Sequence, residues 1–293
     1  MSDAESEDDE PIEPSRPTTS GNTDNTENED SDEGGGRMEG GDNQSDDSST
    51  DSSQSLTEEQ LLDIQIANTK QMEQEIDVMI NKQTYLFDKL YHDYDFNKCK
   101  DISAKCRRRN NFSNAGLAYA EIKYSQYAEI FCQLYQHGLE REGLAGKFVD
   151  IGSGTGKAVF ATALLHDFKW IVGIEVLDDL VEISNTILSD RWKQFILNGE
   201  IKEVDKRQID IKFVCGDASY IPWQDGDVVF MNATSFGEKL RASLTAVAEK
   251  MRKDSLLISV THPLNSKMFE CVLALKMDVS WGSATAYVYK KTK

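Results

Sequence analysis

The chain has 293 residues and a formal net charge of −19, and most of this charge lies at one end. Residues 1–55 contain 18 Asp and Glu against two Arg, a net charge of −16, so the remainder of the chain is nearly balanced. The five cysteines form no Cys-x-x-Cys pair, so we expect neither a disulfide framework nor a metal site. No apolar run approaches the ~18 residues of a membrane span, so we do not expect a membrane protein.

The acidic segment 1–55 contains no aromatic residue and is rich in Asp, Glu, Ser, Gly and Asn. Such a segment cannot bury enough apolar surface to offset the entropy lost on ordering. We therefore expect a disordered acidic tail. It would serve either as a solubilising tail or as an arm that meets a basic partner such as a histone. Its first ten residues include six acids, so we expect no signal peptide and an intracellular protein.

Helical order is predicted to begin at Thr57, which forms a capping-box pattern with Gln60. Apolar residues then recur at spacings of three and four as far as Leu90, which indicates one long helix, or two with a break. A shorter helix is expected over Ser125–His137.

Residues 97–114, which lie between these helices, read as a loop or linker. This segment carries a basic cluster formed by Lys98, Lys100, Lys105, Arg107, Arg108 and Arg109. The cluster indicates a phosphate-bearing partner, and an ordinary solvated loop is the alternative interpretation.

From Gly146 onward, short apolar strands alternate with helical segments, which predicts a parallel sheet. Strands are expected at 147–151, 169–176, 211–217, 226–232 and 255–260, with helices at 157–168, 177–199 and 238–253. The last two strands, 272–281 and 284–291, have no helix between them and should form an antiparallel hairpin at the edge. This order resembles the seven-stranded class I fold of S-adenosylmethionine-dependent methyltransferases. The expected organisation is an α/β fold with a tail (1–55), an N-terminal helical region (56–140) and a methyltransferase domain (141–293).

The segment "FVDIGSGTGKAVF" after the first strand could bind three kinds of ligand. A P-loop would need glycine at the position of Ile151 and Ser or Thr at the position of Ala158, and a dinucleotide turn would need glycine in place of Lys157. Asp150 followed by three alternate glycines remains. Because glycine has no Cβ, the backbone can pass close beneath a ligand, and this spacing favours S-adenosylmethionine.

Two acids at the ends of later strands support the same cofactor. Glu175 ends the second strand, where it can accept both ribose hydroxyls, although a dehydrogenase would also place an acid there. Asp217 ends the third strand, where it can accept from the adenine amino group. In open α/β sheets, ligands bind at the carboxyl ends of the strands, so the three features should meet at one site.

The methyl acceptor is indicated by motifs outside the glycine loop. The fourth strand reads "VFMNATSF" and lacks the prolines typical of enzymes that methylate base amino groups. "YAEI" precedes the glycine loop, and "VSWGSATAYVY" follows near the end of the chain. In this order and spacing, the four motifs over residues 115–293 resemble the Dot-type (disruptor of telomeric silencing) histone lysine methyltransferases.

This resemblance implies transfer of methyl from S-adenosyl-L-methionine to a lysine in the core of histone H3 on nucleosomes, in the nucleus. It places Asn232 beside the methyl donor and Tyr287 in the lysine channel, with Tyr289 as the rival. The basic cluster would contact DNA or ubiquitin. The implied cofactor-binding residues are Tyr119, Ala120, Glu121, Ile122, Phe148, Val149, Asp150, Ile151, Gly152, Ser153, Gly154, Thr155, Gly156, Lys157, Glu175, Asp217 and Ala218.

The chain departs from the family pattern at four positions, namely Ala120, Ile122, Ala233 and Thr234. The first two lie in the upstream loop, and the last two replace an asparagine and a phenylalanine in the fourth-strand motif. Two other hypotheses remain open: a methyltransferase acting on another protein or on RNA, and a non-catalytic chromatin-binding module.

Overall fold

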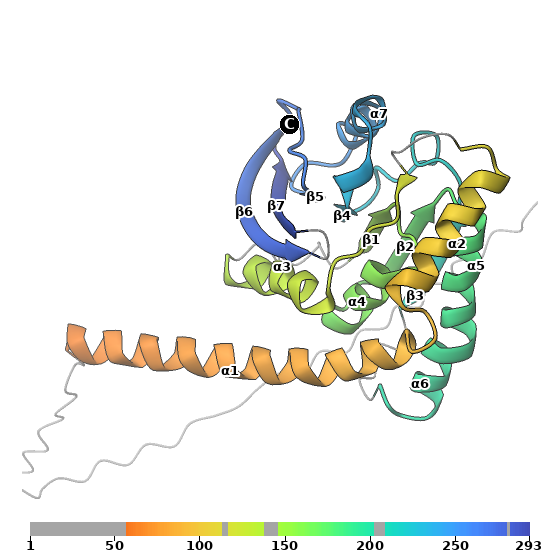
Figure 1. The fold of residues 1–293 in the computed structure, drawn as a ribbon. Coiled ribbons are helices and arrows are strands. Elements are labelled where there is room, and N and C mark those ends of the chain that lie inside the picture. Colours follow the sequence, from red (N-terminus) through yellow and green to blue (C-terminus); the bar gives the residue numbers. More distant parts are fainter. Residues whose placement is uncertain (1–56, 113–116, 138–145, 202–208, 280–281) are drawn as a thin grey trace, which may run out of the picture. The chain divides into compact units, whose positions relative to one another are not determined.

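Seven strands form one sheet in the order β3-β2-β1-β4-β5-β7-β6 (Figure 1). The parallel strands are β1 (Lys147–Ile151), β2 (Trp170–Glu175), β3 (Asp210–Cys215), β4 (Val228–Met231) and β5 (Leu256–Val260). β7 (Gly282–Lys291) pairs antiparallel with both β5 and β6 (Phe269–Val279), so β6 is the edge strand. The predicted α/β class, its seven strands and the antiparallel pair at the edge are confirmed.

The computed structural model describes residues 57–112, 117–137, 146–201, 209–279 and 282–293. The acidic tail predicted for residues 1–55 lies outside these ranges, as do Ser280 and Trp281 of the C-terminal motif. No helix in the described ranges is both long enough and apolar enough to cross a membrane.

Helices cover both faces of the sheet, because alternate residues of the strands point to opposite sides. Phe148 of β1 lies in a core shared with α1 (Glu58–Leu90), α3 (Tyr124–Gln136), α4 (Lys157–Leu165) and α5 (Asp178–Ile187). Its neighbours Val149 and Ile151 lie in a second core with Trp223 and α7 (Glu238–Ala248). Figure 1 shows α1, α3 and α4 on one side of the sheet and α7 on the other.

The predicted capping box begins α1. The Thr57 hydroxyl accepts from the Gln60 backbone N–H at 3.2 Å, and the Gln60 side chain accepts from the Thr57 N–H at 2.9 Å. The helix then continues without a break for 33 residues. Near its C-terminal end Leu86, Phe87 and Leu90 are buried against the core, whereas Leu61 and Leu62 near its start are exposed.

The expectation of a loop over residues 97–114 is wrong, because Phe96–Arg109 forms helix α2. Asp95 caps this helix by accepting from the Lys98 N–H at 2.9 Å. Its buried residues are Cys99, Ser103 and Cys106, which lie on one face at spacings of four and three. These side chains are small, so the segment lacks the large apolar stripe that usually indicates a helix.

The helix expected over 177–199 is also more complex than predicted. α5 is followed by a π-helical turn, η2 (Leu188–Trp192), and then by the short helix α6 (Lys193–Leu197). The turn places Trp192, which is 2 % exposed, against the ring of Phe160 in α4 at 5.6 Å between centroids. Packing of this tryptophan therefore accompanies the local widening of the helix.

Candidate functional site

A cavity of about 590 Å³ opens at the carboxyl ends of β1, β2 and β4. β1 lies between β2 and β4, so this is the point at which the strand order reverses. Such a switch point is where open α/β sheets bind ligands, and the volume lies within the usual range for small-molecule sites.

Most of the predicted cofactor-binding residues line this cavity, and three do not. The residues that do, together with Asn232, are Tyr119, Ala120, Glu121, Ile122, Asp150, Ile151, Gly152, Ser153, Gly154, Thr155, Lys157, Glu175, Asp217 and Ala218. Phe148 and Val149 are fully buried in the two cores, and Gly156 serves as the N-cap of α4. Phe148 and Val149 of β1 therefore support the site from behind, whereas Asp150 and Ile151 at the end of the same strand form part of its wall.

The glycine loop turns through three left-handed residues. Gly152, Gly154 and Gly156 have φ angles of +78°, +54° and +81°, which residues with a Cβ rarely adopt. A Cβ on Gly152 would lie 2.9 Å from Cζ of Phe236, and one on Gly154 would lie 3.1 Å from Cε2 of Tyr119. The alternate glycines are therefore required by backbone conformation as well as by close packing.

Glu175 is bound by backbone amides rather than left free. Its Oε2 accepts from the Gly154 N–H at 2.8 Å, and its Oε1 accepts from the N–H groups of Val176 and Leu177 at 2.9 and 3.0 Å. Burial raises the pKa of this carboxyl group, and the three backbone hydrogen bonds oppose that rise. Glu175 thus fixes the glycine loop to the turn after β2 while it lines the cavity.

Asp150 lies at the base of the same loop and is 2 % exposed. Burial raises the pKa of its carboxyl group well above the usual value, and the nearby Glu175 adds to the rise. A buried carboxylate is costly unless a cation or hydrogen-bond donor compensates it. An ammonium group in the cavity would supply that compensation.

The upstream loop is bound to the glycine loop by polar contacts. The Tyr119 hydroxyl donates to Glu121 and lies 3.0 Å from Oγ1 of Thr155. Nζ of Lys157 donates to Oε2 of Glu121 at 2.6 Å and lies 5.0 Å from the centroid of the Tyr91 ring. Burial, followed by the charge of Glu121, raises the pKa of Tyr119 well above its usual value, so this phenol remains a donor.

Asn232 lines the same cavity as Glu175 and comes directly after β4. Its Nδ2 donates to the carbonyl oxygen of Ala120 at 3.4 Å, and its Oδ1 accepts from the Thr234 hydroxyl at 2.8 Å. The ring of Phe236 from the same segment packs over Gly152. The fourth-strand motif therefore forms one wall of the cavity and contacts both loops that the sequence predicted.

The residues after β3 complete the far end of the cavity. Asp217 is exposed, and its Oδ1 accepts from the Ser219 N–H at 2.8 Å. The carbonyl oxygen of Ala218 accepts from the indole N–H of the buried Trp223 at 2.9 Å. Both residues are held in place by local contacts while they line the cavity.

The two tyrosines proposed for the lysine channel lie outside this cavity wall. Tyr287 of β7 pairs with Ser259 of β5, and neither Tyr287 nor Tyr289 is among the described residues that line the cavity. Tyr289 is 6 % exposed, and its hydroxyl accepts from the Leu264 N–H at 3.0 Å. Tyr287 packs against the second core, as does Phe236 of the cavity wall.

Two cavity residues that the sequence did not single out come from the region predicted as a loop. Ser103 of α2 and Phe112 just beyond that helix both line the cavity. The Ser103 hydroxyl is fully buried and has no hydrogen-bond partner among the described residues. The pattern of small residues on α2, read together with its Asp95 cap, is the sequence signal that could have located Ser103.

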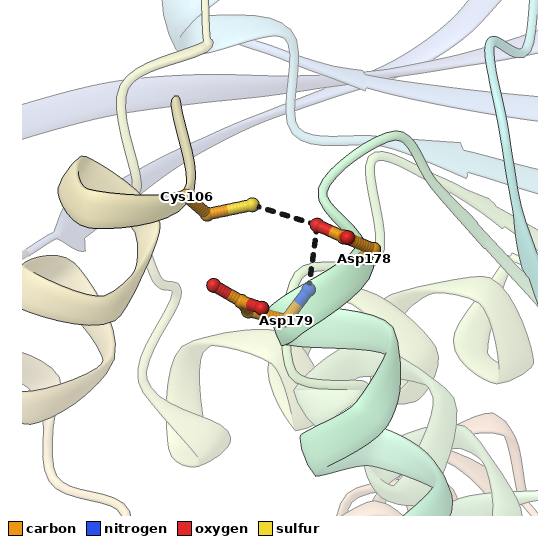
Figure 2. Close-up of side chains that lie close together, drawn as sticks. All are labelled: Cys106, Asp178 and Asp179. Carbon is orange, nitrogen blue, oxygen red and sulfur yellow. Dashed lines mark hydrogen bonds between the residues drawn. The ribbon is translucent and has the colours of Figure 1, made fainter. Parts of the chain in front are cut away.

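A clasp of four side chains holds α2 against the start of α5. The thiol of Cys106 donates to Oδ1 of Asp178 at 3.0 Å, as Figure 2 shows. The Arg109 guanidinium donates to Asp178 at 2.7 Å and to Asp179 at 2.8 Å. Cys106, Asp178 and Asp179 are close enough to ligate a cation together, but the guanidinium already binds both carboxylates.

These contacts set the protonation of the clasp. The Cys106 thiol, more than the Arg109 cation, holds the pKa of Asp178 below its usual value. Burial and the hydrogen bond to Asp178 raise the pKa of Cys106, so the sulfur remains a protonated donor. The basic cluster is therefore not uniform, because Arg109 forms intramolecular ion pairs whereas Lys105 and Arg108 are exposed.

The site fits S-adenosyl-L-methionine in four respects. The glycine loop leaves no room for side chains beneath a ligand, and buried Asp150 offers an anionic partner to an ammonium group. Tyr119 and Phe236 lie over the glycine loop, where aromatic faces can attract a sulfonium cation. The buried Ser153 hydroxyl, which has no partner among the described residues, adds an unused polar group in the cavity wall.

Comparison with known proteins identifies one matching family. The model of the family described as "Histone methylation protein DOT1" matches residues 99–283. No curated protein shows significant sequence similarity to the chain.

Several solved structures are similar at low identity. A magnesium protoporphyrin IX methyltransferase from Synechocystis with bound S-adenosylmethionine has 11% identity and a TM-score of 0.42, and the alignment covers 71% of this chain and 90% of that one. An RNA methyltransferase from Salinibacter ruber in complex with S-adenosyl-L-homocysteine has 16% identity and a TM-score of 0.39, and the alignment covers 56% of this chain and 90% of that one. The tRNA methyltransferase TrmK from Bacillus subtilis has 16% identity and a TM-score of 0.38, and the alignment covers 55% of this chain and 65% of that one. Similarity at this level does not identify a substrate.

Proposed function

We propose that the protein methylates a lysine in the core of histone H3 on nucleosomes. It belongs to the DOT1 histone methylation proteins, because the model of this family matches most of the chain. The family resemblance predicted from the sequence is confirmed, and the protein is an S-adenosyl-L-methionine-dependent methyltransferase. The histone-lysine substrate, the nucleosome partner and a nuclear role as a chromatin regulator belong to the proposal.

One observation carries the assignment of the reaction to this cavity. The amide of Asn232 contacts the upstream loop at Ala120 and lies in the same cavity as the glycine loop and Glu175. The upstream loop, the glycine loop with Glu175, and the segment of Asn232 are separate in the sequence. The fold brings them together at the point where the strand order reverses. We assign the three segments to the binding of the cofactor and the placement of the methyl acceptor.

When bound, S-adenosyl-L-methionine supplies a methyl group activated by a sulfonium. Asp150 and Glu175 orient the ligand at the base of the cavity, and Asn232 offers amide groups to the incoming amine. The apolar side chains of Phe230 and Phe236 in the cavity wall disfavour a charged lysine ammonium and so lower its pKa. The reactive neutral amine is then favoured, and much of the rate comes from its alignment.

The exposed part of the basic cluster supports the nucleosome as the partner. Lys105 and Arg108 project from α2, whose other side packs against the cavity and α5. Phosphate groups of nucleosomal DNA attract such cations, and an acidic surface of ubiquitin would do the same. The predicted acidic tail would complement basic histone segments.

Incubation with nucleosomes, free histone octamers, RNA and radiolabelled cofactor tests the proposal. We expect label in histone H3 of nucleosomes, located to a lysine by mass spectrometry. The matched variants are Asn232→Ala, expected to retain only a small, measurable fraction of the activity, and Asn198→Ala, which changes an asparagine at the end of α6 and should retain activity. Label only in RNA or in another protein would contradict the histone assignment. Tight nucleosome binding without methyl transfer would instead indicate a non-catalytic chromatin module.

A further inference from the structure

Asn232 is held by two threonines that do not themselves reach the cavity. We propose that the hydroxyl groups of Thr234 and Thr261 are positioning groups that fix the side-chain amide of Asn232 for methyl transfer. The inference rests on the proposed function in so far as Asn232 faces the reacting groups.

The three side chains form a continuous hydrogen-bonded chain. Oγ1 of Thr234 lies 2.8 Å from Oδ1 of Asn232 and 2.7 Å from Oγ1 of Thr261. At its other end, the amide nitrogen of Asn232 lies 3.4 Å from the carbonyl oxygen of Ala120. The amide of Asn232 is thus bound on both sides, to the upstream loop and to the residue after β5.

The direction of every hydrogen bond in this series follows from its last acceptor, the carbonyl oxygen of Ala120. The carbonyl oxygen of Ala120 can only accept, so the nitrogen of the Asn232 amide must face it and Oδ1 must face Thr234. Thr234 then uses its single hydroxyl hydrogen on Oδ1. Thr261 must therefore donate to Thr234, and an amide flip would lose the hydrogen bond to Ala120 and place two oxygen atoms against each other.

Thr261 adopts an unusual backbone conformation that presents its hydroxyl to Thr234. Its φ angle is +74°, in the left-handed region that β-branched residues rarely occupy. Its N–H donates to the carbonyl oxygen of Thr285 in β7 at 2.8 Å, which holds the residue in place. Backbone strain of this kind persists where surrounding contacts dictate it and is frequent at functional sites.

The burial and location of the two threonines argue against a direct role of their side chains in methyl transfer. Both are partly buried, and neither belongs to the described residues that line the cavity, whereas Asn232 does. Any effect of their hydroxyls on the reaction must therefore pass through Asn232. Loss of either hydroxyl breaks the chain and frees the amide to rotate.

The test compares Thr234→Val and Thr261→Val with Thr234→Ser, which restores the hydroxyl, in the full-length protein. Thr245→Val is the matched control, because the Thr245 hydroxyl donates to a backbone carbonyl of α7 at 2.8 Å and is also partly buried. We expect kcat on nucleosomes to fall about 10- to 100-fold in the two valine variants, since small misplacement of a reacting group has effects of this size. The affinity for S-adenosylhomocysteine should change less than about twofold, and Thr234→Ser and Thr245→Val should match the wild type.

A second measurement is independent of the methyl acceptor. In protein labelled with ¹⁵N-asparagine, the side-chain N–H₂ protons of Asn232 should exchange slowly with solvent deuterium in the wild type and faster in Thr234→Val. Deuterium exchange at Asn232 that is as fast in the wild type as in Thr234→Val would overturn the inference, whatever the substrate. An inactive wild type with the expected slow exchange would overturn the proposed function and leave the positioning role supported.

The dependence on Asn232 is tested by combining variants. In an Asn232→Ala background, Thr234→Val should cause no further loss of kcat, because its effect passes through the amide. An additional loss of the same size as in the wild type would show that Thr234 acts by another route. Equal loss of activity and of thermal stability in Thr234→Val, without rescue by Thr234→Ser, would show a merely structural role.

Discussion

The backbone N–H of Gly154 donates to Oε2 of Glu175 at 2.8 Å, so the glycine loop after β1 is bound directly to the acid that ends β2. The other oxygen of Glu175 accepts from the two residues that lead into α5. One buried carboxylate thereby sets the relative position of two loops that line the cavity. Cofactor binding and loop geometry therefore depend on the same side chain.

Glu175→Gln is expected to weaken the binding of S-adenosylhomocysteine about tenfold, which corresponds to about 1.4 kcal/mol. The substituted amide places an N–H₂ group against a backbone N–H at one of the three contacts, so the loop must move. Isothermal titration calorimetry measures the change. Glu182→Gln, on the exposed face of α5, is the control and should bind like the wild type. Equal affinity in both variants would contradict the assigned role of Glu175.

Gly154→Ala and Gly199→Ala separate backbone strain from ligand contact. Both glycines have positive φ angles, +54° and +70°, so each substitution should cost about 1–2 kcal/mol of unfolding free energy. A Cβ on Gly154 would meet Tyr119 at 3.1 Å, whereas one on Gly199 would have nothing within 4 Å. Calorimetry should therefore show loss of cofactor affinity in Gly154→Ala alone. Similar loss in Gly199→Ala would show that affinity follows general stability.

Asp150 should give the protein a stability that decreases with rising pH. Burial holds the pKa of its carboxyl group well above the usual value of 3.8, so the folded state binds the proton more tightly than the unfolded state. This contribution to stability is complete below the unfolded pKa and is lost as the pH rises through the folded pKa. Asp150→Asn removes the titration, so this variant should gain stability relative to the wild type as the pH rises.

Urea unfolding at about pH 4 and about pH 8 measures this difference. The advantage of Asp150→Asn should be larger at the higher pH, while its affinity for S-adenosylhomocysteine should be lower than that of the wild type. A difference in unfolding free energy that does not depend on pH would contradict a buried, titrating Asp150.

Nucleosome binding should distinguish the exposed cations of α2 from the paired one. Lys105→Ala combined with Arg108→Ala should weaken binding and reduce the slope of log affinity against log salt, because each phosphate contact contributes about 0.9 to that slope. Arg109 forms ion pairs with Asp178 and Asp179, so Arg109→Ala should change the slope less. Its main effect should be a small loss of unfolding free energy, as is typical of exposed pairs.

Electrophoretic mobility shifts over a range of salt concentrations give both slopes. If Arg109→Ala reduces the slope as much as the double variant does, the ion pairs of Arg109 with Asp178 and Asp179 break when the protein binds nucleosomes. If none of the variants changes the slope, α2 does not face the DNA.

The positions of the strands and the glycine loop could be predicted because they depend on local pattern. β1 is a run of apolar residues followed by alternate glycines, and the three left-handed φ angles cost glycine less than any other residue. The capping box of α1 is equally local, since its two partners are three residues apart. In contrast, α2 was not found, because its buried face consists of small residues whose burial depends on α5.

The sequence alone determined the α/β order, the ligand-binding loop and the family of the protein, since each is encoded by short local motifs and by their order along the chain. The tertiary structure decided which polar groups meet. Cys106 and Asp178 are 72 positions apart, Ala120 and Asn232 are 112 apart, and Thr234 and Thr261 are 27 apart. Hydrogen bonds between such pairs form only after the sheet has brought their strands together, so no local pattern records them.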